Sequence, residues 1–396
     1  MHVLCLGGNY SALGEAHGEK LSAAINTNLK YFWAACKCKG YSQEDLIRLA
    51  RLRENDFTSY RLEEIYGIAK GAKREYPELL AYNLYHQVIF PDECTVWMAI
   101  GKASSTGATL FAKNSDKIGD SSLSGPNFHQ YKEINIVVIY RPDGGNAIIG
   151  VGAAGLTGLK MGLNDKGVAC GTNIARTIEL TQRSVDLSGL RAIDRGQLAR
   201  IGLEENNASA AAQRIASMLI ENPTSTPGCI EFADANMGVI VEGSYDRVAI
   251  EKVQDDIAAR ANAFIVLKEL NDPTNMSSFC RHLRAQQLLA PHKGKVTPEL
   301  MIAISMDHGN GPGMNSICRH SDDYRDETSL STAVMEINLD QSERSKIHIA
   351  LGKPCHAWHS PGGHITLDMQ AKEKEIPESF LNGEAFKNNY VEIPKI

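Results

Sequence analysis

The chain has 396 residues, of which 43% are hydrophobic and 22% are charged, as is ordinary for a soluble globular protein. A formal net charge of −6 gives no general attraction to nucleic acid or to an anionic membrane, and no stretch approaches the roughly 20 apolar residues of a membrane helix. No nucleic-acid or membrane partner is therefore predicted. Nine cysteines without a C-x-x-C pair, and a start without a charged leader, predict a cytoplasmic protein.

Residues 10–90 are predicted to be helical. Apolar residues recur at helical spacing over residues 11–39 and again over residues 60–75. Ser42, which is followed closely by two acidic residues, is a suitable N-cap for a shorter helix between them. Pro91 ends this region, and the sequence beyond it is of a different kind.

From Cys94 onward, β-forming residues and turn sequences alternate. The predicted hairpins join residues 94–101 to 109–113, 134–140 to 147–151, 159–163 to 168–172, and 333–339 to 347–351. Further strands are predicted at residues 230–232, 239–243, 248–253 and 263–267, and helices at residues 195–204, 208–221, 277–289 and 298–306. Hairpins with helices in separate blocks indicate an α+β layered domain and not alternating βαβ units.

The candidate chemistry lies in the first hairpin. Cys94 begins one strand, and Asn114 and Asp116 stand at the end of the strand that is predicted to return beside it. Pairing of these strands would place a thiol near a carboxylate. The spacing alone favours the plainer interpretation, a buried cysteine at a strand end that behaves as a small hydrophobic residue.

Several short motifs occur in the same order as in one known family and extend over most of the chain. They are residues 13–18 (L-G-E-A-H-G), 64–72 (E-I-Y-G-I-A-K-G-A), 94–95 (C-T), 114–116 (N-S-D), 162–173 (G-L-N-D-K-G-V-A-C-G-T-N), 316–319 (S-I-C-R) and 351–354 (L-G-K-P). In these motifs the chain resembles the isopenicillin N acyltransferase (acyl-coenzyme A:6-aminopenicillanic acid acyltransferase) family, a branch of the cysteine N-terminal-nucleophile hydrolases.

The resemblance implies an α+β fold, the four-layer αββα sandwich, with two antiparallel sheets between helical layers. It also implies a zymogen that undergoes autocatalytic cleavage between Glu93 and Cys94. Residues 1–93 would then be a helical pro-segment that is retained as a small subunit. Residues 94–396 would be the catalytic part of the same single domain.

The resemblance also assigns roles to individual residues. Cys94 is the expected thiol nucleophile in self-cleavage and in turnover, and its freed α-amine is the expected general base. Asp116 would orient this amine, and Arg319 would lie beside the nucleophile and hold its charged form. Asn262 would donate a hydrogen bond to the oxyanion. Two further residues, Asn114 and Asn173, are candidate supporting residues.

Two features separate the chain from the penicillin enzyme. Glu93 stands where that enzyme has glycine, and a carboxylate beside the scissile carbonyl is expected to slow the first N-to-S shift or make it pH-dependent. The N-S-D sequence at residues 114–116 is more similar to the cysteine dipeptidases and secernins, which hydrolyse amides. The favoured function is therefore hydrolysis of a linear amide C–N bond in a small acylated amine or peptide, through an acyl-thioester on Cys94.

Two alternatives remain open at the level of sequence. The first is acyl-coenzyme A-dependent N-acyl transfer, for which acyl-coenzyme A would be a second partner. The other is a scaffold of the same fold that does not cleave itself. Only Glu93 supports this alternative, whereas the presence of Cys94, Asp116 and Arg319 speaks against it.

Metal and cofactor sites are not predicted. The densest histidine group comprises His356, His359 and His364, and it matches no common helical zinc pattern. The intervening Pro-Gly-Gly sequence at residues 361–363 indicates a loop.

Overall fold

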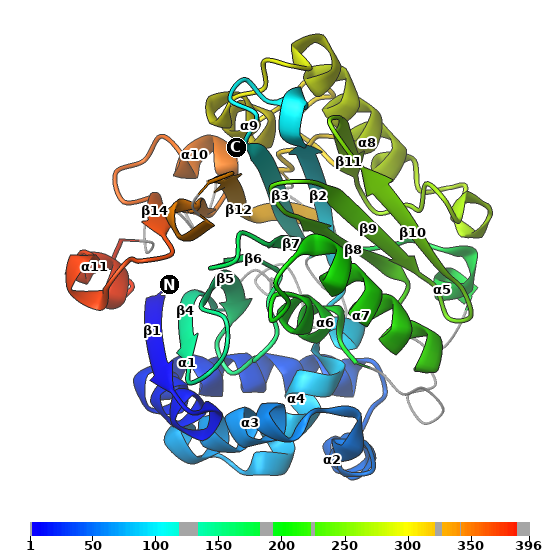
Figure 1. Cartoon of the computed structure of the whole chain (residues 1–396). Coiled ribbons are helices and arrows are strands. Elements are labelled where there is room, and N and C mark those ends of the chain that lie inside the picture. The colour runs from blue at the N-terminus through cyan, green and yellow to red at the C-terminus, as the bar shows by residue number, and fades with distance from the viewer. Residues whose placement is uncertain are drawn as a thin grey trace, which may run out of the picture.

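Two stacked β-sheets with helices against their outer faces make up the described part of the chain (Figure 1). The computed structural model describes residues 2–118, 134–182, 193–222, 226–320, 327–340 and 342–385. Met1 and the residues from 386 onward, which belong to the predicted small and large parts, lie outside this description. The order of the layers is helix, sheet, sheet, helix, as expected for the αββα sandwich.

The helices form two main groups. Those before Cys94, in blue in Figure 1, lie together with α6 and α7 against one sheet, and α8 and α9 lie against the other. The helices are α1 (Tyr10–Cys38), α2 (Gln43–Arg51), α3 (Ser59–Ala72), α4 (Tyr76–Ile89), α5 (Ile178–Gln182), α6 (Arg195–Gly202), α7 (Ala208–Glu221), α8 (Met276–Leu289), α9 (Pro298–Ser305), α10 (Pro354–Ala357) and α11 (Glu378–Leu381). No helix in the described ranges is long and apolar enough to cross a membrane.

The larger sheet has the strand order β1-β4-β5-β6-β7-β8-β9-β10, and the smaller has the order β11-β2-β3-β12-β13-β14. The strands are β1 (His2–Gly8), β2 (Asp92–Ala99), β3 (Thr109–Ile118), β4 (Asn135–Pro142), β5 (Ile148–Ala153), β6 (Met161–Asn164), β7 (Ala169–Ile174), β8 (Gly228–Ala233), β9 (Gly238–Gly243), β10 (Val248–Val253), β11 (Ile257–Arg260), β12 (Glu327–Ile337), β13 (Lys346–Leu351) and β14 (His364–Asp368). The predicted hairpins are confirmed as β2–β3, β4–β5, β6–β7 and β12–β13.

Two expectations about the strands are wrong. The sheets are not wholly antiparallel, because β1 pairs with β4 in parallel. The predicted strand at residues 263–267 is a loop, and the strand of this region, β11, lies before it. The loop forms because the backbone N–H groups of Ile265, Val266 and Leu267 donate to the buried carboxylate of Glu242 instead of to a neighbouring strand.

Both faces of the central strands, such as β4 and β2, are buried, whereas every second residue of the edge strand β14 is exposed. The side chains of the central strands divide between layers by the two-residue period of a strand. On β4, Ile136 and Val138 pack toward the helices, while Val137 and Ile139 pack between the sheets. On β2, Val96 and Met98 belong to the core between the sheets, whereas Trp97 and Ala99 face α8 and α9. This alternation fixes the face of the sheet on which each site residue lies.

The motifs at residues 13–18 and 64–72 lie where helices α1 and α3 cross closely. A Cβ atom on Gly14 of α1 would lie 2.0 Å from the carbonyl oxygen of Glu64, and one on Gly67 of α3 would lie 2.4 Å from that of Ser11. Such contacts are far inside van der Waals distance, so only glycine permits α1 and α3 to pack backbone to backbone. His17 lies within this region and its Nε2 accepts a hydrogen bond from the backbone of Gly155 over 3.1 Å.

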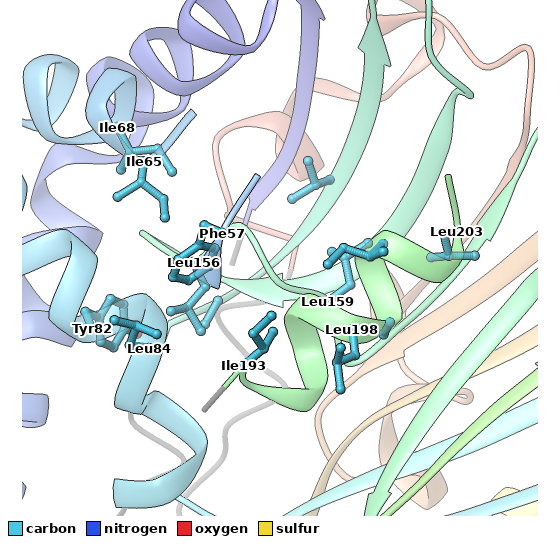
Figure 2. Packing of buried hydrophobic residues seen from close by; sticks show 14 of the residues in the cluster. Phe57, Ile65, Ile68, Tyr82, Leu84, Leu156, Leu159, Ile193, Leu198 and Leu203 are labelled. Atoms are coloured by element: carbon cyan, nitrogen blue, oxygen red, sulfur yellow. The ribbon is translucent and has the colours of Figure 1, made fainter. Parts of the chain in front are cut away.

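The helices before Cys94 share a single hydrophobic core with the chain after it (Figure 2). Ile65, Ile68 and Tyr82 from α3 and α4 belong to the same buried cluster as Leu159 and Leu198 from the later part of the chain. The segment before Cys94 is therefore an integral layer of the fold.

Candidate active site

Cys94 lies within β2 and has no exposed surface. Its backbone N–H donates to Oδ1 of Asn262 over 3.2 Å, and its carbonyl oxygen accepts from Nη1 of Arg281 over 2.8 Å. By strand alternation Cys94 shares a face with Val96 and Met98, which pack between the sheets. The thiol is thus on the inner face, while the backbone on either side of it is held by polar groups.

The register of the β2–β3 hairpin pairs Asp116 with Glu93 and pairs Cys94 with Ser115. Because cross-strand partners point to the same side of a sheet, Asp116 and Glu93 share the face toward α8, and the Cys94 thiol lies on the opposite face. The expectation that the hairpin would set thiol and carboxylate side by side is wrong in this respect. A one-residue difference in register reverses the face, and sequence spacing does not fix the register.

The Asp116 carboxylate is completely buried. Its Oδ1 accepts a hydrogen bond from Oγ of Ser329 over 2.6 Å, and its Oδ2 lies 3.6 Å from Arg319 and 3.9 Å from Arg281. Burial raises the pKa of this carboxyl above its usual value, although both arginines and Ser329 oppose the rise. Among the described residues, Oδ2 has no hydrogen-bond partner and so remains able to accept one.

Glu93, the residue before Cys94, is held by three arginines. Its Oε1 accepts from Nε of Arg176 over 2.8 Å, and its Oε2 accepts from Arg319 over 2.7 Å and from Arg281 over 3.3 Å. Burial by itself would raise the pKa of Glu93, but attraction to Arg319, Arg176 and Arg281 outweighs it and holds this pKa well below its usual range. Glu93 is therefore an ionised, firmly placed side chain.

Arg281 is a central residue of the site that the sequence analysis missed. It is fully buried in α8 and also donates to Oγ1 of Thr95 over 2.9 Å and to Oδ1 of Asn262 over 2.7 Å. A signal for it exists in the sequence, because it lies at helical spacing with Ala285 and Leu289 on the buried face of α8. An arginine on an apolar helix face requires an anionic or carbonyl partner.

Arg319 contacts Glu93 and Asp116, and its expected role of holding the charged form of Cys94 stays a prediction. Its Nε donates to the backbone oxygen of Met314 over 3.0 Å, and Nη2 donates to Oγ of Ser277 over 3.0 Å. These bonds fix the guanidinium between α8 and the segment that carries the S-I-C-R motif.

Asn262 contacts Cys94 with its amide oxygen. That oxygen accepts from the Cys94 N–H, while Nδ2 donates to the carbonyl of Ile174 over 2.8 Å. Asn262 thus lies beside Cys94, as predicted. Its role as donor to an oxyanion stays a prediction.

The two supporting asparagines hold backbone segments. Asn114 donates to the carbonyl oxygens of Ser305 over 2.9 Å and of Ile317 over 3.0 Å, and it accepts from Thr332. Asn173 donates to the carbonyl of Ala261 over 3.1 Å, directly before Asn262. Both therefore position neighbours of the site through the backbone.

A group of potential metal ligands lies next to Arg319. It consists of His308, Cys318, His320 and Cys355, whose ligand atoms all lie within 4.8 Å of one another. Of the histidines that the sequence analysis weighed, His364 packs against Trp358 at 5.4 Å between ring centroids, whereas the His356 ring lies 6.1 Å from that of His320.

Comparison with known proteins relates this site to one family. The family model for acyl-coenzyme A:6-aminopenicillanic acid acyl-transferase matches residues 104–353, a range that contains Asp116, Asn262 and Arg319 but begins after Cys94. The 40 kDa form of acyl-coenzyme A:6-aminopenicillanic-acid-acyltransferase from Emericella nidulans is 27% identical over 378 residues, covering 89% of this chain and 93% of that protein.

Two solved structures are also similar. One is a Caenorhabditis elegans orthologue of N-acylethanolamine-hydrolyzing acid amidase, with 16% identity, coverage of 63% of this chain and 95% of that one, and a TM-score of 0.40. The other is a mutant of the conjugated bile acid hydrolase from Clostridium perfringens, with 10% identity, coverage of 71% and 94%, and a TM-score of 0.43. The family match spans more than half of the chain, so the protein is an enzyme of the acyl-coenzyme A:6-aminopenicillanic acid acyl-transferase family, and its described residues form an αββα sandwich.

Proposed function

We propose that the enzyme cleaves itself between Glu93 and Cys94 and then hydrolyses a linear amide of a small acylated amine or peptide through an acyl-thioester on Cys94. One observation carries this proposal: buried polar groups hold the Glu93–Cys94 bond on both sides. Three arginines fix the Glu93 side chain, and Asn262 and Arg281 fix the backbone of Cys94. A bond held in one conformation favours a single intramolecular attack.

Self-cleavage takes two balanced steps. The Cys94 sulfur attacks the carbonyl carbon of Glu93, the C–N bond breaks, and the nitrogen takes up the proton that the thiol loses. Water then hydrolyses the resulting thioester, which leaves a carboxylate on Glu93 and restores the thiol of Cys94. Because Cys94 is wholly buried here, an outside substrate reaches it only after this change.

In turnover the freed α-amine, with a reference pKa of about 7.7–8.0, accepts the thiol proton. Asp116 is suited to orient this amine, because it faces the Glu93 side of the strand and has an oxygen able to accept a hydrogen bond. The substrate acyl group passes to the sulfur, the amine product leaves with the proton, and water releases the acid. Asn262 is the proposed oxyanion donor.

Acyl transfer is the second candidate function, because the Emericella nidulans relative is named as an acyl-coenzyme A acyltransferase. In that reaction an amine, in place of water, resolves the thioester, and acyl-coenzyme A supplies the acyl group. Incubation of the processed protein with acyl amides, with and without acyl-coenzyme A and an acceptor amine, distinguishes the two. Free acid without coenzyme A supports hydrolysis, and N-acylated product formed only with coenzyme A supports transfer.

Retention of the segment before Cys94 as a small subunit is part of the proposal. Strand β1 is hydrogen-bonded along its length to β4, and helices α1, α3 and α4 share one core with the later chain. A cut before Cys94 removes none of these contacts.

A cytoplasmic location is also proposed. The nine cysteines all fall within the described residues, and none of them forms a disulfide. Free thiols are typical of a reducing compartment. Fractionation of the producing cells tests this, and recovery of the enzyme outside the cytoplasm would contradict it.

The central test is replacement of the nucleophile. Cys94→Ala is expected to remain one chain and to have no amidase activity, since neither cleavage nor turnover then has a nucleophile. The parent protein should give fragments of 93 and 303 residues by intact mass (396 − 93 = 303). Cys229→Ala removes another fully buried strand thiol and serves as the control, which should cleave normally. A cut elsewhere, or activity in Cys94→Ala, would refute the mechanism.

A further inference from the structure

Four sulfur- and nitrogen-bearing side chains from three segments meet beside the S-I-C-R motif. His308 follows α9, Cys318 and His320 flank Arg319, and Cys355 lies in α10. Nε2 of His320 is 3.6 Å from Sγ of Cys318 and 3.1 Å from Sγ of Cys355. The rings of His308 and His320 are 4.8 Å apart between centroids. We call these four residues the Cys2His2 cluster.

The dimensions of the Cys2His2 cluster fit a tetrahedral metal ion. With Zn–S bonds of about 2.3 Å and Zn–N bonds of about 2.0–2.1 Å, tetrahedral geometry separates neighbouring donor atoms by about 3.3–3.8 Å. The two donor distances given above lie near this range, and the upper bound of 4.8 Å for the cluster exceeds it by an amount that small side-chain rotations can close. Two thiols and two imidazoles are donors that zinc prefers and that calcium and magnesium do not.

Hydrogen bonds among the four side chains do not satisfy the polar atoms of all of them. Nε2 of His308 is buried and, among the described residues, has no hydrogen-bond partner. An orphaned buried nitrogen is costly unless something outside the protein chain occupies its lone pair or takes its proton. A metal ion in the cluster would supply that missing partner.

The backbone brings the ligands together without help from the metal. The N–H of Cys318 donates to the carbonyl of Asp307 over 3.1 Å, which places Cys318 next to His308. The N–H of His320 donates to the carbonyl of Pro312 over 2.7 Å. The site is thus formed by the fold and not by chance rotamers of mobile side chains.

We propose that the Cys2His2 cluster binds a structural zinc ion that joins the S-I-C-R segment to the end of α9 and to α10. All four positions are filled by protein ligands, so the ion has no open position for water or substrate and serves architecture. The side chains of Cys318 and His320 lie in the cluster, whereas the guanidinium of the intervening Arg319 contacts the carboxylates of Glu93 and Asp116. The zinc therefore fixes the backbone that positions Arg319 in the candidate active site.

The site cannot be recognised in the sequence because the spacing of its ligands matches no common zinc motif. Cys318 and His320 are two positions apart, His308 stands ten positions before Cys318, and Cys355 is far along the chain. The prediction of no metal site rested on the histidine group at residues 356–364, which contains none of these ligands.

Metal analysis of the full-length protein tests the proposal. Protein purified without chelator from cells supplied with zinc should contain about one zinc ion per chain, as measured by inductively coupled plasma mass spectrometry. Cys355→Ser and His308→Gln should each lower this content severalfold and reduce the melting temperature. Cys5→Ser, which alters another partly buried free thiol outside the cluster, should keep the full content. A zinc-free parent protein, or equal zinc in all variants, would overturn the proposal.

Two further measurements use the unaltered protein and so test the proposal even where the variants fail to fold. Unaltered protein loaded with Co²⁺ should show the visible absorption of tetrahedral cobalt with thiolate ligands, and Zn²⁺ should displace it. Absence of that spectrum would count against the site. Peptide mass spectrometry under non-reducing conditions should find Cys318 and Cys355 as free thiols after zinc removal. A disulfide between them in the freshly purified protein would show a redox pair instead of a zinc site.

Discussion

At the scale of single residues, the site is organised by charge that is buried and paired. Glu93 and Asp116 lie on one face of the β2–β3 hairpin, and Arg281 and Arg319 lie close to both. The two carboxyl groups nevertheless differ, since the pKa of Glu93 is lowered and that of Asp116 is raised. The difference follows from contacts, because Glu93 receives direct hydrogen bonds from three arginines, whereas the nearest arginine nitrogen to Asp116 is 3.6 Å away among the described residues.

Asp116→Asn tests orientation of the α-amine against simple packing. The substitution keeps size and an acceptor for Ser329 but removes the charge, so the amine of the processed enzyme should be misplaced. We expect kcat to fall by at least roughly 10², in the range for a positioned acid–base group. The melting temperature should stay within a few degrees because the change is nearly isosteric. Normal turnover with a large loss of stability would instead make Asp116 a structural residue.

Glu93 gives a pH dependence that can be measured in uncleaved protein. A carboxyl whose pKa is lowered by folding stabilises the fold above its unfolded pKa of about 4.3, and this stabilisation is lost as the pH falls toward its folded pKa. In a Cys94→Ala background, Glu93→Gln should lower the free energy of unfolding at pH 7 by about 3 kcal/mol, because buried arginines lose their carboxylate. The penalty should shrink below pH 4 in urea titrations.

The exposed residue Glu63 provides the matched control for that measurement. Glu63→Gln should change the free energy of unfolding by no more than about 0.5 kcal/mol at either pH, as is usual for surface substitutions. A Glu93→Gln penalty that is independent of pH would mean that the arginines do not require the ionised side chain.

At the scale of elements, the helices before Cys94 are fixed by the glycine-lined crossing of α1 and α3. Gly67→Ala would place a methyl carbon 2.4 Å from the Ser11 carbonyl oxygen, and that atom belongs to rigid backbone. We expect a net loss of about 1–3 kcal/mol, even though alanine is the better helix former. Urea unfolding of the uncleaved Cys94→Ala protein measures this.

Gly7→Ala in β1 is the control for the crossing, because its nearest contact would be the Arg141 carbonyl oxygen at an ordinary 3.8 Å. It should unfold within about 0.5 kcal/mol of its parent. Equal losses in both variants would show that the cost reflects glycine replacement in general and not the crossing.

At the scale of the whole molecule, the proposed cut lies inside β2, away from β1 and from the large core that join most of the segment before Cys94 to the rest. The segment before Cys94 is joined to the rest of the chain in two places. Its strand β1 pairs with β4 in the larger sheet, and its helices share the hydrophobic core shown in Figure 2 with the later chain. Self-cleavage would therefore alter the end of one strand and leave the four layers in place.

Retention of the small fragment follows from this arrangement. After processing, the two fragments should co-elute in size-exclusion chromatography in native buffer and separate only in denaturant. The reason is that the apolar core between them stays buried whether or not the peptide bond is intact. Elution of the 93-residue fragment by itself in native buffer would contradict the prediction.

The sequence by itself determined the local features of this protein. Period-two and helical patterns located most strands and helices, and the short motifs indicated the family, the αββα fold and the candidate site residues Cys94, Asp116 and Arg319. These features depend on residues close together in the chain or on motifs that can be recognised one at a time.

Only the tertiary structure decided how distant residues combine. It set the hairpin register that separates the Cys94 thiol from Asp116, turned residues 263–267 into a loop around Glu242, and brought Arg281 to Glu93. It also gathered the Cys2His2 cluster from three segments. Register, charge pairing and ligand geometry depend on which layers pack together, and nothing in the local spacing of residues encodes those distances.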